Sequence, residues 1–194
     1  MISTIKKPLL LVAFAVSTLF VASCKDNQKA EDTKEVSEEH NEAKFDNNEQ
    51  ENNAQFLVDA AELNIEGIHL GQLAQQKGRT AHVKELGKMM EDAHTKLQRD
   101  LTLLAKSKTV TIPGSPTDDV KDTYTELNKK SGNDFDKAYA DLMVDKHKEA
   151  IQAFEEAAND TKDSEIKNWA TATLTELRKH LNHSIECQKK SEKM

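Results

Sequence analysis

Cysteine and proline are scarce in this chain of 194 residues. The two cysteines, Cys24 and Cys187, allow at most one intramolecular disulfide, which excludes a disulfide framework. Of the three prolines, Pro8 lies near the start, whereas Pro113 and Pro116 share one short segment. Because a proline inside a helix breaks or kinks it, long helices are permitted on both sides of that segment. Since a disulfide framework is excluded, the fold must be stabilised by a packed core.

Strand signals and the common catalytic motifs are missing as well. The chain has no sustained alternation of apolar and polar residues and no Asn-Gly turn, which argues against a β-rich fold. It contains no Gly-x-Ser-x-Gly, P-loop, Gly-x-Gly-x-x-Gly or Cys-x-x-Cys motif, so no catalytic nucleophile can be assigned. Acidic side chains outnumber basic ones by 34 to 27, without a basic cluster. This balance argues against a nucleic-acid partner, since such binding depends on neutralising phosphates.

The first 24 residues have the layout of a secretory signal peptide. Lys6 and Lys7 precede an apolar run over 9–20, which is too short to span a bilayer. Small residues then precede a lone cysteine, and the sequence Val21-Ala22-Ser23-Cys24 resembles a bacterial lipobox. The resemblance implies cleavage of residues 1–23, acylation of Cys24 and a membrane-anchored lipoprotein of the bacterial envelope, on the outer membrane. The alternative is a secreted protein with Cys24 free.

Residues 25–54 predict a disordered acidic tether. They carry four Lys against ten Asp and Glu, and their only large apolar side chains are Val36 and Phe45. Such a segment buries too little apolar surface to offset the entropy lost on ordering. We therefore expect a lipidated tether over 24–54 and one folded domain over 55–190. After cleavage 25 basic side chains face 34 acidic ones, so the acyl chains, rather than charge, would hold the protein to the membrane.

Apolar residues recur at helical spacing throughout the predicted domain. Four long helices are expected over about 55–77, 80–107, 134–158 and from 164 onward, with a shorter one over about 117–130. Gly78 is a natural stop for the first helix, and Thr80 is a candidate cap for the second. The fold prediction is all-α, a ferritin-like antiparallel four-helix bundle with one long crossover that contains the short helix.

Polar residues interrupt the apolar stripe of each long helix. Glu66 and His94 lie 13 and 15 residues from the first hairpin turn, near residue 79, which places them within about 3 Å in height. His147 lies 14 residues before the second turn, near 161, and His180 lies 19 after it, a mismatch of about 7–8 Å. Glu176, at 15 residues, is closer in height to His147. One layer could therefore hold Glu66, His94, His147 and either His180 or Glu176.

This layer predicts one transition-metal ion in the bundle core. Helical bundles build metal sites from inward Glu and His side chains, often as Glu-x-x-His, and Glu91 precedes His94 at that spacing. Imidazole with carboxylate suits zinc, copper or iron. The alternative is that carboxylates or backbone carbonyls satisfy the buried histidines without any metal. The candidate ligands are Glu66, Glu91, His94, His147, Glu176 and His180.

Residues 55–188 resemble the bacterial family called domain of unknown function 4142, exported proteins placed near the ferritin-like superfamily. The segments that carry the resemblance are Phe56–Ala61, Leu70–Lys77, Met90–Lys96, Ala138–His147 and Leu177–Leu181. The resemblance implies a helical fold and an envelope location, and it supplies no established reaction. The acid-His pairs of the family appear here with one residue inserted, as Asp92-Ala-His94 and Asp145-Lys-His147.

Three functions remain open from the sequence. The first is a tethered envelope protein that binds a metal or small ligand in the bundle. The second is a structural, interaction or stress-related module whose histidines only shape the core. The third and least favoured is a ferritin-like redox enzyme, because helix four has Leu177 where the di-iron pattern needs a Glu, and helix three has His147 where a bridging Glu is expected.

Overall fold

The computed structural model describes residues 31–193, and this part of the chain folds into six α-helices with no strand. The four long helices are α2 (Asn48–Lys77), α3 (Ala81–Ser107), α5 (Gly132–Asp160) and α6 (Ser164–Ser191), and the two short ones are α1 (Thr33–Glu42) and α4 (Asp118–Asn128). None of these helices is both long and apolar enough to cross a bilayer. The predicted signal peptide and Cys24 lie outside the described residues.

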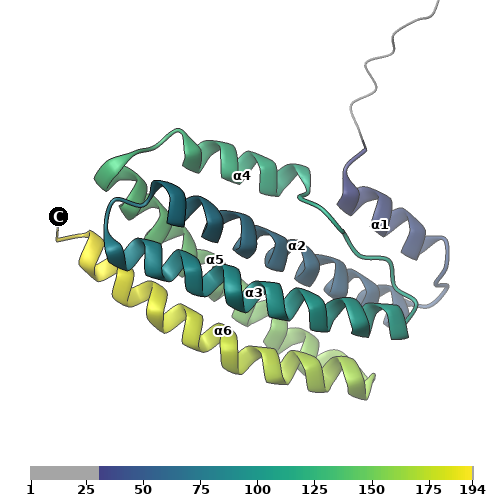
Figure 1. Ribbon diagram of the computed structural model, residues 1–194. Helices are drawn as coiled ribbons and strands as arrows, with labels where there is room; N and C mark the ends of the chain where they lie inside the picture. The colour runs from purple at the N-terminus through teal and green to yellow at the C-terminus, as the bar shows by residue number, and fades with distance from the viewer. Residues whose placement is uncertain (1–30, 194) are drawn as a thin grey trace, which may run out of the picture.

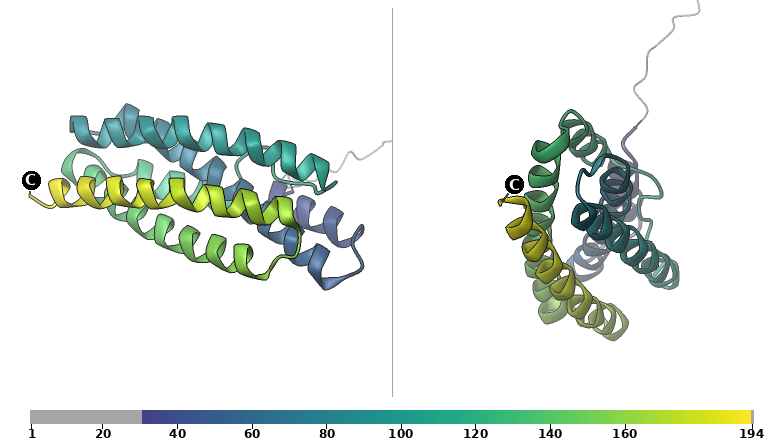
Figure 2. Two further views of the ribbon diagram at one scale, coloured as in Figure 1. Left: turned by 90° about the horizontal axis from the view of Figure 1, so that it is seen from below. Right: turned by 60° about the vertical axis from the view of Figure 1, so that its left-hand side comes forward.

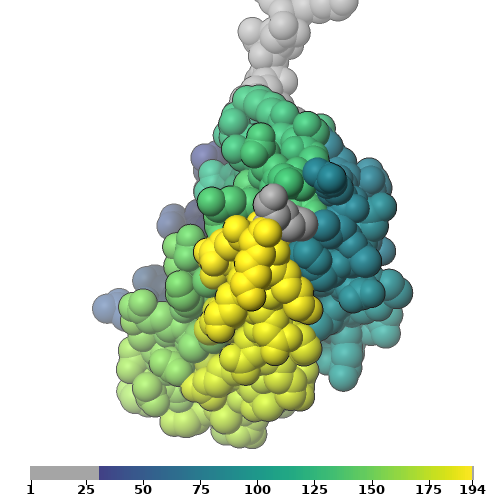
Figure 3. All heavy atoms as spheres, turned by 90° about the vertical axis from the view of Figure 1, so that its left-hand side faces the viewer, coloured from purple at the N-terminus to yellow at the C-terminus, as the bar shows by residue number. Residues whose placement is uncertain are grey.

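The long helices form two antiparallel hairpins packed side by side (Figures 1 and 2). Helix α2 packs chiefly on α3, and α5 packs chiefly on α6. The connection from α3 to α5 returns the chain to the end where α3 begins, so α3 and α5 run in the same direction (Figure 1). Viewed from the end where α6 terminates, α6 lies between α5 and α3 (Figure 3). The predicted four-helix bundle with a helix-containing crossover is therefore confirmed, while its relation to ferritin stays a prediction.

The turn of the first hairpin is attached to α5 by a buried carboxylate. Asp136 is fully buried and accepts hydrogen bonds from the backbone N–H groups of Arg79 and Thr80, at 2.8 and 2.9 Å. The Thr80 hydroxyl also donates to Asp136, at 2.6 Å. Thr80 occupies the N-cap position of α3 as expected, but its side chain makes no capping hydrogen bond because it is engaged with α5.

The prediction of a disordered tether over 24–54 is wrong from Thr33 onward, because α1 and the first turns of α2 occupy most of that segment. Polar contacts, rather than apolar burial, hold α1 in place. The buried Asn41 side chain donates to the carbonyl of Thr111 and accepts from its N–H group, both at 2.8 Å. Lys34 forms ion pairs with Asp59 and Glu62 on α2. The folded region thus begins about twenty residues earlier than expected.

Two clusters of buried apolar residues fill the bundle, one toward each end. Leu57, Leu101, Phe154 and Leu177 belong to the first. The second includes Leu70, Met90, Phe135, Tyr139 and Met143. A layer of buried polar side chains separates them along the sequence of each long helix, and the candidate site lies in this layer.

Candidate metal centre

Three histidines from three helices meet in the polar layer. His94 comes from α3, His147 from α5 and His180 from α6, and their side chains are 1%, 4% and 3% exposed. Their ring centroids lie 5.3 to 5.7 Å apart, and one potential ligand atom from each lies within 4.8 Å of the other two. Within residues 31–193, this is the one group of three or more His, Cys, Asp or Glu side chains placed closely enough to share a metal ion.

Hydrogen bonds fix the tautomers of two of these rings. Nδ1 of His94 lies 3.0 Å from Oδ1 of Asn64, and Nδ1 of His147 lies 2.7 Å from the carbonyl oxygen of Met143. Both oxygens can only accept, so each Nδ1 carries the proton and donates it. Each Nε2 is therefore left with a lone pair. Such support of the far nitrogen by an oxygen is the usual arrangement around histidines that bind metals.

Three of the remaining ring nitrogens are buried without a hydrogen-bond partner in the described part of the chain. These buried atoms are Nε2 of His94, Nε2 of His147 and Nδ1 of His180. A buried polar atom without a partner costs about 1–3 kcal/mol, so three of them in one layer are an unusual burden on a core. A cation bound by all three nitrogen atoms, with the proton of His180 on its Nε2, would satisfy all of them at once.

Burial keeps the three imidazoles neutral, which is the form that binds a metal. Removal from water lowers the pKa of His94 well below its usual 6.5, and the two neighbouring histidines lower it further. Burial also lowers the pKa of His147, against the opposing effect of its hydrogen bond to Met143. For His180, burial and the proximity of His147 lower the pKa to about 4.

Helix α2 contributes space rather than a ligand. Gly67 faces the His94 ring so closely that a Cβ atom at this position would lie 2.9 Å from Nε2 and closer still to Cγ and Cδ2. Any larger residue would therefore displace the imidazole. Asn64 lies one helical turn before Gly67, so the same face of α2 both orients His94 and makes room for its ring.

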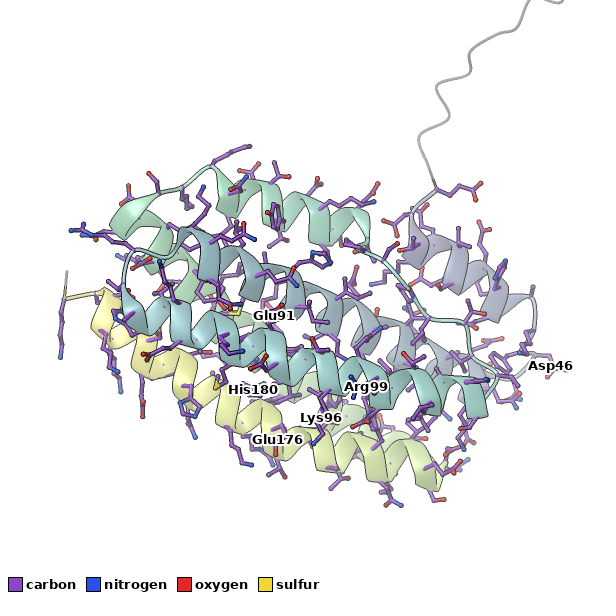
Figure 4. The ribbon with its side chains drawn as sticks, in the orientation of Figure 1. Asp46, Glu91, Lys96, Arg99, Glu176 and His180 are labelled. Carbon is purple, nitrogen blue, oxygen red and sulfur yellow. The ribbon has the colours of Figure 1, made fainter. Side chains whose placement is uncertain are left out.

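The structure does not bring the three predicted carboxylate ligands into this cluster. Figure 4 labels two of them, Glu91 and Glu176, together with His180. Glu66 is buried but pairs with Lys146 of α5 at 3.1 Å, and burial raises its pKa. Glu91 accepts hydrogen bonds from Gln72 and Gln75 of α2, at 2.8 and 2.6 Å. Glu66 lies between Asn64 and Gly67 in the sequence, but the helix rotates by about 100° per residue, so those two residues face His94 instead.

Glu176 is the third of these carboxylates and lies on the exposed side of α6. It pairs with Lys179 at 2.9 Å. The negative charge of Glu176 nevertheless favours the protonated form of His180. It therefore raises the pKa of His180, which burial lowers. Glu176 therefore acts on the cluster from outside and offers it no ligand atom.

Sequence reasoning missed Asn64 and Gly67. A signal for Asn64 was present, because it lies three or four residues from Ala60, Ala61 and Gly67 and therefore shares a face of the helix with these small residues. No sequence pattern distinguishes Gly67 from other helical glycines, since its role depends on the ring of a residue on another helix.

The side chains of His94, His147 and His180 form a donor set that fits a metal ion. Three imidazoles are a known donor set for zinc, and nitrogen donors also suit copper and iron. Metal–nitrogen bonds of about 2.0–2.1 Å in tetrahedral geometry require nitrogen atoms about 3.4 Å apart. The three rings would have to approach one another slightly from their present separations. Three protein ligands would leave a fourth position for a small ligand.

Comparison with known proteins gives a family but no characterised relative. A search of the curated proteins found no match, and a search of the solved structures found none either. The family match includes most of α1, in agreement with the early start of the folded region. Because the sequence model described as "Domain of unknown function (DUF4142)" matches residues 36–186 of the 194, the chain belongs to this family.

Proposed function

We propose that this protein is an exported lipoprotein whose helical bundle binds one transition-metal ion through His94, His147 and His180. The observation that carries the metal proposal is the convergence of three buried histidines, each of which has a buried ring nitrogen without a partner within residues 31–193. The donors are nitrogen atoms, which favours zinc, copper or iron over calcium or magnesium.

The location rests on the sequence of the first 24 residues. A basic start, a short apolar run and small residues before Cys24 support export followed by acylation. The membrane partner would be reached through the acyl chains, since the acidic chain has no basic cluster to attract anionic lipids.

Replacing Cys24 by Ala tests this anchor. We expect the Cys24→Ala protein to leave the membrane pellet after an alkaline wash, while the wild type stays in it. A matched Ser23→Ala variant should stay with the membrane, because it keeps the thiol and a small residue before it. A Cys24→Ala protein retained in the washed pellet would place the anchor elsewhere.

Metal binding is tested by elemental analysis of protein purified without an affinity tag, followed by melting curves with Zn²⁺, Cu²⁺ or Fe²⁺. At a free metal concentration of 100 times the dissociation constant, binding should stabilise the fold by about 2.7 kcal/mol. We expect His147→Ala to lose most of this gain because one of three ligands is removed. His183→Ala is the matched control, since His183 is exposed on α6 and outside the cluster.

Two results would contradict the metal proposal. Equal metal shifts in the wild type and His147→Ala would place binding on surface side chains. No shift in either protein would favour the second reading, in which the histidines only shape the core. The hydrogen bonds of His94 and His147 to protein oxygens are the observation that supports that second reading. A di-iron redox centre is less well supported, because Glu66, Glu91 and Glu176 each have partners outside the cluster.

A further inference from the structure

A cavity of about 330 Å³ lies between α2 and α5, bounded at one side by the first turn of α4. None of the three clustered histidines lines it. Its apolar wall is formed by Phe56, Ala60, Ala150 and Phe154. Binding pockets for small molecules are typically apolar cavities of about 300–1,000 Å³ with a few polar groups, and this cavity lies at the lower end of that range.

The polar groups of this cavity are mostly carboxylates from three helices. The acidic lining residues are Asp59, Glu62, Glu66, Asp119 and Glu149, and Lys146 is the only basic one. Glu66 is paired with Lys146. Asp119 and Glu149, from α4 and α5, are exposed and form no ion pair or side-chain hydrogen bond within residues 31–193.

An ammonium group of the chain itself already contacts two of these carboxylates. The Lys34 ammonium of α1 lies 2.8 Å from Asp59 and 2.6 Å from Glu62. A primary ammonium is therefore already held at one edge of the cavity. Even with Lys34 and Lys146 counted, the five carboxylates leave a local net charge of −3.

We propose that this cavity binds a small organic ammonium ion with an aliphatic body. The hydrocarbon part would lie against Phe56, Phe154 and the alanines, and the ammonium would lie between Asp119 and Glu149. Anions are disfavoured by the carboxylates, and a bare metal ion would leave the apolar wall without a role.

The only tryptophan of the chain provides a direct signal for this binding. The Trp169 ring lies 5.9 Å from the Phe56 ring and 5.4 Å from the Phe154 ring, between centroids. An occupant of the cavity contacts both phenylalanines and should alter the tryptophan fluorescence. The measurement is a titration of the full-length protein with 1,5-diaminopentane, with 1,5-pentanediol as the neutral compound of matched length.

We expect a saturable fluorescence change with the diamine and binding at least about tenfold weaker with the diol. The double variant Asp119→Asn with Glu149→Gln should lower diamine affinity at least about fivefold without changing the melting temperature, since both side chains are exposed. Asp145→Asn, on an exposed position of α5 outside the cavity, is the matched control and should bind like the wild type.

A second variant tests the cavity itself. Ala153 is an exposed lining residue of α5, and Ala153→Leu should fill part of the space and weaken binding of both compounds. Equal affinity for diamine and diol, an unchanged affinity in the double variant, or no saturable signal would each overturn the proposal.

Discussion

The three lone pairs of the histidine cluster are costly for the metal-free protein. Nε2 of His94, Nε2 of His147 and Nδ1 of His180 are buried without partners in the part of the chain that the structure describes. Replacing a buried polar group by an apolar one of similar shape can be neutral or even stabilising. A core that needed only shape would therefore be served by leucine, and this contrast is what motivates the metal proposal.

Gly67 allows a residue-scale test of how tightly the site is built. We expect Gly67→Ala to destabilise the fold by about 1–3 kcal/mol, because its Cβ overlaps the His94 ring and forces it to move. Alanine ordinarily stabilises a helix relative to glycine, by about 1 kcal/mol, so a loss would show that the steric effect dominates. Urea unfolding measures the difference.

Gly114→Ala is the control for this substitution, since nothing lies within 4 Å of a Cβ at that position. It should be close to neutral. If Gly67→Ala were as stable as the wild type and kept the full metal shift, the ring of His94 would not depend on the space that Gly67 leaves.

The depressed pKa values of the histidines predict a pH dependence of stability in the metal-free protein. Between about pH 6.5 and 4 the histidines of the unfolded chain take up protons, whereas His180 in the folded cluster stays neutral because its pKa is about 4. Stability is therefore fully present above about pH 6.5 and falls on acidification, by up to about 1.4 kcal/mol per pH unit for each proton.

The measurement is chemical unfolding in chelator across pH 4 to 7. His180→Leu should show a smaller loss over this range than the wild type, and the difference isolates one histidine from the buried Glu66, whose raised pKa acts in the opposite direction. Parallel curves for the two proteins would mean that His180 titrates as it does in the unfolded chain.

At the scale of elements, polar contacts from α1 hold the segment between α3 and α4 in place. Asn41 bonds both backbone groups of Thr111, as a neighbouring strand would, and Lys44 donates to the carbonyl of Thr109. At the other end of α1, Thr33 donates to the carbonyl of Ser115. The crossover between α3 and α4 thus takes its shape from a segment more than sixty residues earlier in the chain.

Removing the contact between Asn41 and Thr111 should loosen both α1 and the segment between α3 and α4. We expect Asn41→Ala to cost about 1–3 kcal/mol, because it leaves two backbone groups of Thr111 without their partners. Hydrogen exchange should become faster at Thr111 in particular. Glu42→Ala, at the neighbouring exposed position, is the control and should be neutral. Unchanged exchange at Thr111 in Asn41→Ala would show that α1 does not hold the crossover.

At the scale of the whole molecule, much of the bundle follows from local rules. The spacing of apolar residues and the breakers at Gly78, Pro113 and Pro116 predicted the long helices, the short helix and the crossover, with ends within a few residues except at the start of α2. Heights along the helices predicted that His94 and His147 share a layer and left its further member open between His180 and Glu176, of which the structure places His180 there. Both inferences depend only on distances along a helix, which sequence spacing supplies.

What could not be predicted depends on how helices rotate and on contacts between distant segments. Glu66 and Gly67 are neighbours in sequence, but only the packing of α2 on α3 decides which of them faces His94. The segment that forms α1 has too little apolar surface to predict a packed helix, and the Asn41 contact that holds it spans 70 residues. The role of a carboxylate is also hard to predict from sequence. A nearby amide or lysine side chain can bind the carboxylate and keep it from a metal site, as Gln75 does with Glu91.

The pairing of helices into two hairpins has a consequence for the folding kinetics. Each hairpin forms from helices adjacent in the chain, so docking of the two hairpins, which closes the longer loop, is expected to come last. His94 belongs to the first hairpin, whereas His147 and His180 belong to the second. A metal ion bound by all three would join the hairpins across their interface. It would therefore slow unfolding while leaving the rate of folding nearly unchanged, because its third bond forms only after docking. On this view the ion lengthens the lifetime of the native state and contributes little to reaching it.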